Sequence, residues 1–425
     1  MFEFLNHKFD QETFTAHFYY RDINSIEYQE TIKFTKTDFD FLGQNAKTLD
    51  RALDLAHIII GVSYYKSHPT SQVTSSYALD SWQANFFNKV YQEGLSQFAY
   101  ENDLTRDNLA HFQSSTPDNT LSENEDYYHA QGILAGESGG KDSLLVSKIL
   151  QNNQLSWTGA MISSTNNYPK ILDHIGAQKL QIIIRKIDTK NLQKANGLNG
   201  HVPITYINMA ILLVQAILNG DSIILTSIGH EGAEPHAFIG DLLVNHQWSK
   251  TWEAEQLFAD YTRRYISKNI KIGSPIRQFS ELKIAELFVK NCWAEYGHQF
   301  SSCNVANYKQ GNDNSKLSWC GLCAKCANSY LLFAPFLEPA ELDSIFENQE
   351  SLFEKPELAD DFKGLLGLDG IMKPFECVGE IDELRAAYHM KKPGYKNLPF
   401  DIPASTFDYR KEYPAQNLLE LNYAK

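Results

Sequence analysis

The chain has 425 residues, of which 43% are hydrophobic and 21% charged, and its formal net charge is −14. This length allows two or three domains with large cores. The acidic balance argues against a broad nucleic-acid-binding surface, because phosphate backbones attract clustered Lys and Arg. The most apolar run, residues 55–65, is too short to span a membrane, and residues 1–6 lack the basic and apolar regions of a signal peptide. We therefore expect a cytoplasmic protein with neither nucleic acid nor membrane as a partner.

The first 126 residues combine strand and helix patterns. Apolar residues on either side of a turn-prone segment at 21–25 predict two strands, and apolar residues at three- and four-residue spacing predict two helices after them. The polar, turn-rich stretch 114–126 is typical of a linker. This order predicts an α+β accessory domain over residues 1–126. The predicted strands are 14–20 and 27–34, and the predicted helices are 48–66 and 81–100.

A glycine-rich loop, residues 136–143, follows the apolar run 133–135 and precedes a helical pattern. Adjacent glycines let backbone N–H groups turn toward an anion, and the helix dipole adds positive potential at the same point. The loop lacks the four-residue gap of the Walker A pattern and resembles the Ser-Gly-Gly-x-Asp-Ser loop of the ATP pyrophosphatases, which cut ATP between the α and β phosphates. An ordinary glycine-rich turn is the alternative. The predicted ATP-binding residues are Ser138, Gly139, Gly140, Lys141, Asp142 and Ser143, with Asp142 as a Mg²⁺ ligand.

Strand and helix patterns alternate from residue 127 to about 300. This alternation predicts an α/β domain with a Rossmann-like parallel sheet, of the ATP-pyrophosphatase type, covered by helices on both faces. Ligands of such sheets bind at the carboxyl ends of the strands, so loops 164–168 and 227–236 are candidate functional segments by position. The predicted strands are 132–136, 157–163, 180–187 and 222–227.

Four of the six cysteines follow the spacing Cys-x16-Cys-x2-Cys-x2-Cys. Two-residue gaps let neighbouring thiolates converge on one ion, and a fourth thiolate from upstream would close a tetrahedral structural zinc site. An iron–sulfur cluster and uncoordinated cysteines are the alternatives. Cys292 and Cys377 lie outside the pattern and are interpreted as buried small apolar side chains. The predicted ligands are Cys303, Cys320, Cys323 and Cys326, within a helical C-terminal region over residues 301–425.

Four separated segments together resemble a narrower family. They are the loop 138–143, the run Asn199-Gly200-His201-Val202-Pro203, the run Val244-Asn245-His246-Gln247-Trp248-Ser249-Lys250, and residues 319–326 with Ala334-Pro335-Phe336 after them. These segments are similar to those of the UDP-N-acetyl-α-D-muramoyl-L-alanyl-L-glutamate epimerases, bacterial enzymes of peptidoglycan-precursor synthesis within the ATP-pyrophosphatase superfamily. Weaker likenesses at 280–285 and 373–379 extend the resemblance over roughly residues 130–380.

The resemblance implies ATP-dependent epimerisation of the terminal L-Glu of UDP-MurNAc-L-Ala-L-Glu. The glutamate carboxylate would attack the α-phosphate of ATP, giving an acyl-adenylate and pyrophosphate, with Lys141 and Mg²⁺ on Asp142 stabilising the departing charge. The anhydride carbonyl can delocalise a carbanion at the α-carbon, which a free carboxylate opposes. A proton can then leave one face and another return to the opposite face, before hydrolysis gives the D-glutamyl product and AMP.

Epimerisation needs proton-transfer groups within reach of both faces of the α-carbon. Several histidines and one carboxylate lie near the predicted strand-end cleft, and the polar run around Trp248 suits a polar ligand. For each histidine the alternative is a structural or surface side chain, and for the run it is an exposed loop. The candidate catalytic residues are Lys141, Asp142, His230, Glu231 and His246. The candidate substrate-binding residues are His201, Asn245, His246, Gln247, Trp248, Ser249 and Lys250.

Two other classes of function fit parts of the sequence. The loop and the cysteine pattern also resemble 7-cyano-7-deazaguanine synthase, which would imply ATP-dependent modification of a base or small molecule, and a sulfur-transfer variant would need a free catalytic thiol. A nucleotide-binding regulator without turnover is the third reading, which the intact Lys141-Asp142 pair disfavours. Alanine at Cys292 and Cys377 would discriminate the sulfur-transfer variant.

Overall fold

The structure is a computed structural model that describes residues 1–37, 45–122, 126, 128–232, 234–309, 315–346 and 349–423. Its strands are β1 (Phe2–Asp10), β2 (Thr15–Arg21), β3 (Glu27–Lys33), β4 (Val73–Ser75), β5 (Ile133–Gly136), β6 (Thr158–Ser163), β7 (Lys179–Lys186), β8 (Ile223–Leu225), β9 (Ala237–Ile239), β10 (Leu242–Val244) and β11 (Lys271–Gly273).

The α-helices are α1 (Ala46–Ile60), α2 (Val62–Tyr65), α3 (Ser81–Gln92), α4 (Ser96–Glu101), α5 (Lys141–Asn152), α6 (Thr189–Ala195), α7 (Ile204–Asn219), α8 (Trp252–Tyr261), α9 (Glu281–Asn291), α10 (Trp293–Tyr296), α11 (Ala324–Phe333), α12 (Pro339–Asp343), α13 (Ala359–Leu365) and α14 (Ile381–Met390). Shorter or irregular turns are η2 (Arg106–Asn108), η4 (Lys170–His174), η5 (Trp248–Lys250), η6 (Thr262–Ile266), η7 (Val305–Lys309), η8 (Leu352–Glu354) and η9 (Pro356–Leu358).

A nine-stranded sheet with the order β11-β8-β5-β6-β7-β3-β2-β1-β4 organises the molecule. The strands β11, β8, β5, β6 and β7 are parallel to one another, which confirms the predicted α/β class with a largely parallel sheet. Chain order reverses at β5, because β6 and β7 follow on one side and β8 and β11 on the other. Ligands of open α/β sheets bind at such a reversal.

The first three strands extend this same sheet. Strand β3 pairs antiparallel with β7, with Thr31 opposite Lys186, and β2 and β1 continue outward. Strand β1 was not predicted, although its first residues alternate, so that Phe2 and Phe4 are buried. Strands from before and after residue 126 therefore belong to one continuous sheet. The domain boundaries at 126/127 and 300/301 stay predictions, and residues 123–125 of the expected linker lie outside the described residues.

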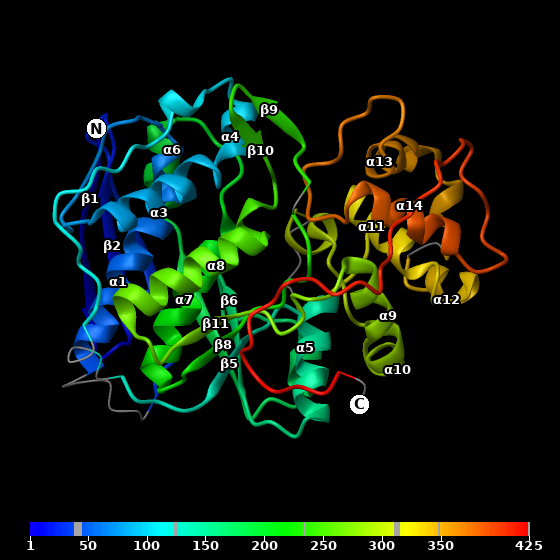
Figure 1. Cartoon of the computed structure of the whole chain (residues 1–425), viewed down its shortest axis with the longest axis horizontal. Helices are drawn as coiled ribbons and strands as arrows, with labels where there is room; N and C mark the ends of the chain where they lie inside the picture. The colour runs from blue at the N-terminus through cyan, green and yellow to red at the C-terminus, as the bar shows by residue number, and fades with distance from the viewer. Residues whose placement is uncertain are drawn as a thin grey trace.

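Helices on both faces of the sheet form two cores. Leu134 of β5 faces the core that α1 and α7 share, whereas its neighbours Ile133 and Ala135 face the core of α5 and α9. This alternation follows from the period of two in a strand. The second core continues into α11, α13 and α14, which lie to the right of the sheet in Figure 1. The final segment returns to α5, where the backbone N–H of Asn422 donates to Asn153 Oδ1 at 2.8 Å.

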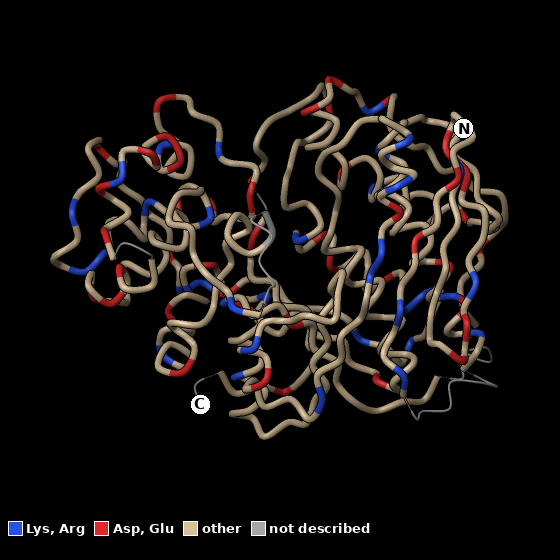
Figure 2. The backbone as a smooth tube through the Cα atoms, turned by 180° about the vertical axis from the view of Figure 1, so that it is seen from behind, with Lys and Arg blue, Asp and Glu red and all other residues tan. Residues whose placement is uncertain are grey.

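Charged residues of both signs are interspersed along the chain. Figure 2 shows Lys and Arg alternating with Asp and Glu over the helices, the loops and the outer strands. Among the described residues, no helix is both long enough and apolar enough to cross a membrane.

Acid should destabilise the fold through its buried histidines. Burial lowers the pKa of His57 to about 3, while its ring contacts the Tyr77 hydroxyl and the Tyr19 carbonyl. An unfolded histidine has a pKa of about 6.5, so the unfolded chain takes up a proton that the folded chain does not as pH falls through that value. At pH 5 this one group should lower the free energy of unfolding by about 2 kcal/mol relative to pH 7.

Urea unfolding of the wild type and of His57→Gln at pH 7 and pH 5 measures this effect. The variant should lose less stability between the two pH values than the wild type does. Replacement of the exposed His129 by Gln is the matched control and should leave the difference unchanged. Equal losses in the wild type and His57→Gln would show that His57 does not titrate in this way.

Candidate active site

Two cavities meet at the carboxyl ends of the parallel strands. A pocket of about 300 Å³ lies among the ends of β5, β6 and β8, where Gly136 and Thr226 line it. A cleft of about 860 Å³ adjoins the pocket and is lined by α4, by the loop before α7 and by segments of the C-terminal half. Ser138, Thr205 and Lys250 line both cavities. The strand-end position predicted for the site therefore contains a two-part cavity.

The glycine-rich loop has the backbone shape of an anion cradle. Gly139 has a φ of +79°, which favours glycine, and a Cβ at this position would lie 2.8 Å from the side chain of Leu317. Gly140 is the N-cap of α5 and offers no side chain to the free amides of the first turn. The Ser143 hydroxyl accepts from the Ser138 N–H at 3.3 Å and can donate to the Gly140 carbonyl at 3.2 Å. The predicted ATP-binding residues thus form one compact loop.

Glu137 is part of this loop but adds little negative charge to it. Its side chain accepts a hydrogen bond from the Ser147 hydroxyl at 2.7 Å and is buried. Burial raises the pKa of Glu137 to about 8, which keeps most of the carboxyl protonated at pH 7. The loop can therefore attract an anion although an acidic residue is part of it.

Two lysines of the site carry charge in buried ion pairs. Lys141 Nζ contacts Asp142 and lies 3.0 Å from Glu281 Oε2. Burial opposes the charge of Lys141, but the two carboxylates raise its pKa above the ordinary value. Lys250 Nζ lies 3.2 Å from both carboxylate oxygens of Glu231. The predicted residues Lys141, Asp142, Glu231 and Lys250 therefore belong to two ion pairs, and of these four only Lys250 lines either cavity.

Arg277 joins the backbone segments that carry the second pair. It is fully buried, and its Nε and Nη2 atoms donate to Glu255 Oε2 at 3.0 and 2.7 Å. Its Nη1 donates to the carbonyls of Gly229 and Lys250 at 2.7 and 2.8 Å. The loop after β8 is thereby fixed against the turn that presents Lys250.

The run of residues 245–250 divides between the cleft and the interior. His246, Ser249 and Lys250 line the cleft, as expected of substrate-binding residues. The other three predicted binders are buried and lie outside both cavities: Asn245 donates to the Gly232 carbonyl, Gln247 donates to the Val378 carbonyl at 2.9 Å, and Trp248 packs on Tyr206. Their contacts shape the loop that carries the cleft residues.

The predicted histidines are separated by the fold. His201 and His246 both line the cleft, with ring centroids 4.5 Å apart. Burial lowers the pKa of His246 to about 4 and that of His201 to about 3, so both imidazoles are neutral at pH 7. His230 stacks on Tyr413 at 3.4 Å and lines neither cavity. The structure therefore brings His246, but not His230, to the cleft.

Cys377 is a cleft residue that sequence reasoning missed. It is half-buried, it lines the cleft, and its Sγ lies 3.7 Å from Nε2 of His246. Cys292 is fully buried behind α5, with its Sγ 3.9 Å from the Leu144 carbonyl. The interpretation of both cysteines as buried apolar side chains therefore holds for Cys292 only. The weak family likeness at 373–379 was the signal that could have drawn attention to Cys377.

The four patterned cysteines meet at the start of α11. Their sulfurs lie within 4.8 Å of one another, and the closest pairs are separated by 3.6 to 3.8 Å. Zinc–sulfur bonds of about 2.3 Å in a tetrahedron place sulfurs about 3.8 Å apart, so the set has the size for one such ion. Backbone N–H groups of Gly321 and Leu322 lie 3.3 and 3.4 Å from the sulfurs of Cys326 and Cys320. The group could hold a metal and connects residue 303 to α11.

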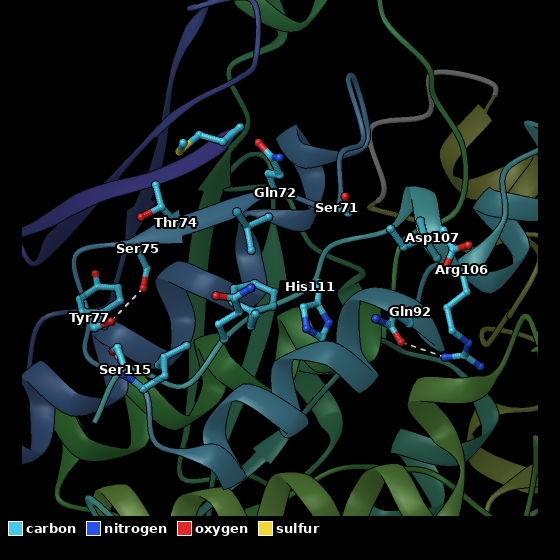
Figure 3. Close-up of a pocket in the computed structure, with 16 residues that line it drawn as sticks. Ser71, Gln72, Thr74, Ser75, Tyr77, Gln92, Arg106, Asp107, His111 and Ser115 are labelled. Carbon is cyan, nitrogen blue, oxygen red and sulfur yellow. Dashed lines mark hydrogen bonds between the residues drawn. The ribbon is translucent and has the colours of Figure 1, made fainter. Parts of the chain in front are cut away.

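A further cavity, of about 990 Å³, lies beside the edge strand β4. Figure 3 shows that its polar side chains include internally bonded pairs, such as Gln92 with Arg106 and Ser75 with the Tyr77 backbone. It contains none of the predicted site residues. We therefore place the candidate active site in the strand-end cavities.

Comparison with known proteins places the chain in a family. A family model described as the MurL N-terminal domain matches residues 1–274, and one described as the MurL C-terminal domain matches residues 299–397. The chain belongs to the MurL family. This result confirms the family resemblance found over residues 130–380, whereas the placement in the ATP-pyrophosphatase superfamily stays a prediction.

Three relatives of this MurL-family chain share the same protein name. A Xanthomonas oryzae pv. oryzae protein named UDP-N-acetyl-alpha-D-muramoyl-L-alanyl-L-glutamate epimerase is 32% identical over 397 residues, which is 91% of this chain and 84% of that protein. A Salinispora tropica protein of the same name is 30% identical over 364 residues, 84% of this chain and 77% of the relative. A Micromonospora protein of that name is 30% identical over 339 residues, with corresponding shares of 79% and 73%.

Both MurL segments contribute to the cleft. Ser138 and Lys250 come from the N-terminal segment, whereas Asn304, Lys325 and Cys377 come from the C-terminal one. A ligand in the cleft of this MurL chain would therefore contact both segments.

Proposed function

We propose that the chain is an ATP-dependent epimerase that converts the terminal L-Glu of UDP-MurNAc-L-Ala-L-Glu to D-Glu through an acyl-adenylate. The names of the relatives support the substrate and the overall reaction. The nucleotide chemistry is supported by the glycine-rich loop, which resembles that of the ATP pyrophosphatases and reaches both cavities through Ser138. The observation that carries the proposal is the position of Lys250 in both cavities beside Ser138.

The two cavities suit the two halves of the reaction. The smaller pocket at the ends of β5, β6 and β8 would take the nucleoside of ATP, which places its phosphates over the loop 138–143. The larger cleft would take the glutamyl end of the peptide. Lys250 lies where the two ligands would meet and can neutralise the α-phosphate as a substrate carboxylate approaches. Mg²⁺, which Asp142 would hold, would supply further charge neutralisation on the pyrophosphate.

Adenylation prepares the α-carbon for proton transfer. A carboxylate oxygen forms a bond to the α-phosphorus while the bond to pyrophosphate breaks, with the loop amides and Lys141 offsetting the departing charge. The resulting anhydride carbonyl accepts the electron pair when the α-proton is removed. A proton returns on the other face, and water releases AMP and the D-glutamyl product.

We also propose that the cysteine group holds structural zinc. Four ligands leave no open coordination position, which is typical of structural and not catalytic zinc. The site would fasten Cys303 to α11, and segments on either side of it reach the cleft through Ser301, Asn304 and Lys325. Reduced thiols of this kind persist in a reducing compartment such as the cytoplasm.

The experiment combines ATP, Mg²⁺ and UDP-MurNAc-L-Ala-L-Glu in D₂O, followed by pyrophosphate measurement and mass spectrometry of the recovered peptide. We expect substrate-dependent pyrophosphate release, deuterium at the glutamyl α-carbon and inverted configuration. A folded, zinc-replete protein that gives neither release nor exchange would contradict the proposal and favour modification of a base or small molecule.

Replacement of Lys250 by Met should slow substrate-dependent pyrophosphate release by about 10²-fold to 10³-fold, because the variant lacks the cation shared by the two cavities. Glu231 would lose its partner, so circular dichroism and thermal unfolding should accompany the assay. Lys271→Met on the exposed end of β11 is the matched control and should release pyrophosphate as the wild type does. Wild-type rates in a folded Lys250→Met variant would remove Lys250 from the reaction.

A further inference from the structure

Cys377 stands at the end of a chain of hydrogen-bonding side chains in the cleft wall. Its Sγ lies 3.7 Å from Nε2 of His246, whose Nδ1 lies 2.6 Å from Oε1 of Gln97. Gln97 in turn donates from Nε2 to Glu101 Oε1 at 2.7 Å. All four side chains line the cleft, and they come from α4, the turn before η5 and the segment 375–379. The fold thus joins residues about 280 positions apart into one row.

This row fixes the tautomer of His246. The Gln97 amide nitrogen donates to a carboxylate, so its oxygen faces the imidazole and can only accept. The proton of the neutral ring must then sit on Nδ1, which leaves Nε2 as an acceptor directed at the Cys377 thiol. Burial lowers the pKa of His246 to about 4, so the ring is neutral at pH 7, and a thiolate formed beside it would raise the basicity of the ring by pairing with the imidazolium. A base oriented by a third group and facing a thiol is the arrangement that activates cysteine.

The backbone around Cys377 is held from three directions. Lys325 Nζ donates to the Cys377 carbonyl at 2.6 Å, Gln247 Nε2 donates to the Val378 carbonyl at 2.9 Å, and the Gly379 N–H donates to Asn328 Oδ1 at 2.9 Å. Lys325 and Asn328 belong to α11, and Gln247 belongs to the run that also carries His246 and Lys250. The thiol is therefore positioned by the same elements that shape the cleft.

We propose that Cys377, activated by His246, is the catalytic residue that removes the α-proton of the adenylated L-glutamyl group. This inference rests on the proposed function. Lys250 also lines the cleft, where its Nζ lies 3.2 Å from the carboxylate oxygens of Glu231. The thiol and this cation thus line the same cleft, in which the activated carboxyl group would lie.

The proton transfers balance as follows. His246 Nε2 takes the thiol proton, and the resulting thiolate forms an S–H bond with the α-hydrogen as the C–H bond breaks. The electron pair of that bond moves into the anhydride carbonyl. A proton from solvent returns to the opposite face of the α-carbon through a second group, and the His246 proton leaves to solvent. The glutamyl group is thereby inverted without oxidation or reduction.

Separate assays of adenylation and proton transfer test the proposal. In Cys377→Ser and Cys377→Ala, deuterium incorporation and inversion should fall by at least about 10²-fold, while substrate-dependent ATP–pyrophosphate exchange stays near the wild-type rate. Cys292→Ala removes a thiol that lies outside the cleft and should leave both assays unchanged. His246→Asn acts through the thiol, so alkylation of Cys377 by iodoacetamide should slow at pH 7 and need higher pH.

Several outcomes would overturn the proposal. Inversion at the wild-type rate in either Cys377 variant would do so, as would equal loss of pyrophosphate exchange and inversion in a folded variant, or a glutamyl thioester trapped on Cys377. If the variants do not fold, alkylation of the wild type decides, with mass spectrometry to count modified Cys377. Enzyme alkylated there should exchange pyrophosphate but not the α-proton, and retained α-exchange would overturn the proposal. A wild type without substrate-dependent pyrophosphate exchange would instead refute the proposed function.

Discussion

Replacement of Asp142 by Asn should abolish substrate-dependent pyrophosphate release, with a loss of about 10³-fold or more, equivalent to about 4 kcal/mol of transition-state stabilisation. Asp142 lies in the first turn of α5, directly after the glycine-rich loop, where under the proposed function its carboxylate would hold Mg²⁺ against bound phosphates. The change also removes one of the two carboxylates that pair with Lys141. Asn is close in size, so the fold should persist.

Pyrophosphate release and thermal unfolding should be measured together for Asp142→Asn. Asp260→Asn is a matched control, because Asp260 lies on α8 in an exposed pair with Arg263, away from the glycine-rich loop. It should behave as the wild type in both measurements. Unchanged release in Asp142→Asn at saturating Mg²⁺ would show that Asp142 is not the metal ligand.

If the cysteine group holds zinc as proposed, replacement of Cys323 by Ser should remove the ion and much of the stability of the C-terminal half. Structural zinc contributes about 10 kcal/mol or more to folding when its thiolate ligands are complete. The cluster ties Cys303 to the start of α11, whose buried face joins the core of α9, α13 and α14. Loss of the metal should therefore also release the residues that close the cleft from this side.

Metal analysis and thermal unfolding of Cys323→Ser measure both effects. Cys292→Ala, which removes a buried thiol outside the cluster, should retain the zinc of the wild type. A full zinc content and an unchanged melting temperature in Cys323→Ser would contradict the assignment. If the wild type contains iron in stoichiometric amount, the cysteine group holds an iron–sulfur cluster and not zinc.

Local sequence predicted the parallel strands β5, β6, β7 and β8 and the loop, because both depend on near neighbours, whereas the short strand β11 was not predicted. The apolar run before Gly136 predicted β5, and the adjacent glycines predicted the turn into α5. The cysteine spacing likewise predicted the group of four cysteines that the structure contains, because three of its members lie within seven residues. The sequence also carried the family resemblance that the two MurL matches confirmed.

Strand β1 and its place in the sheet were harder to predict, since register and partner strands are set by long-range pairing. The sequence contains Phe2 and Phe4, but it does not indicate the sheet edge and the helix α1 that bury them. For the same reason, the continuity of the sheet from β7 into β3 appears only in the structure.

Within the site, the sequence determined which chemical groups are available, and the tertiary structure decided which of them share a cavity. His230 and His246 looked equivalent as candidates, yet packing stacks the first on Tyr413 and places the second in the cleft. The sequence did not distinguish Cys377 from Cys292, because the significance of Cys377 depends on His246 at 3.7 Å, which is 131 residues away. Contacts of this kind arise from the packing of whole elements, which residue spacing along one chain does not encode.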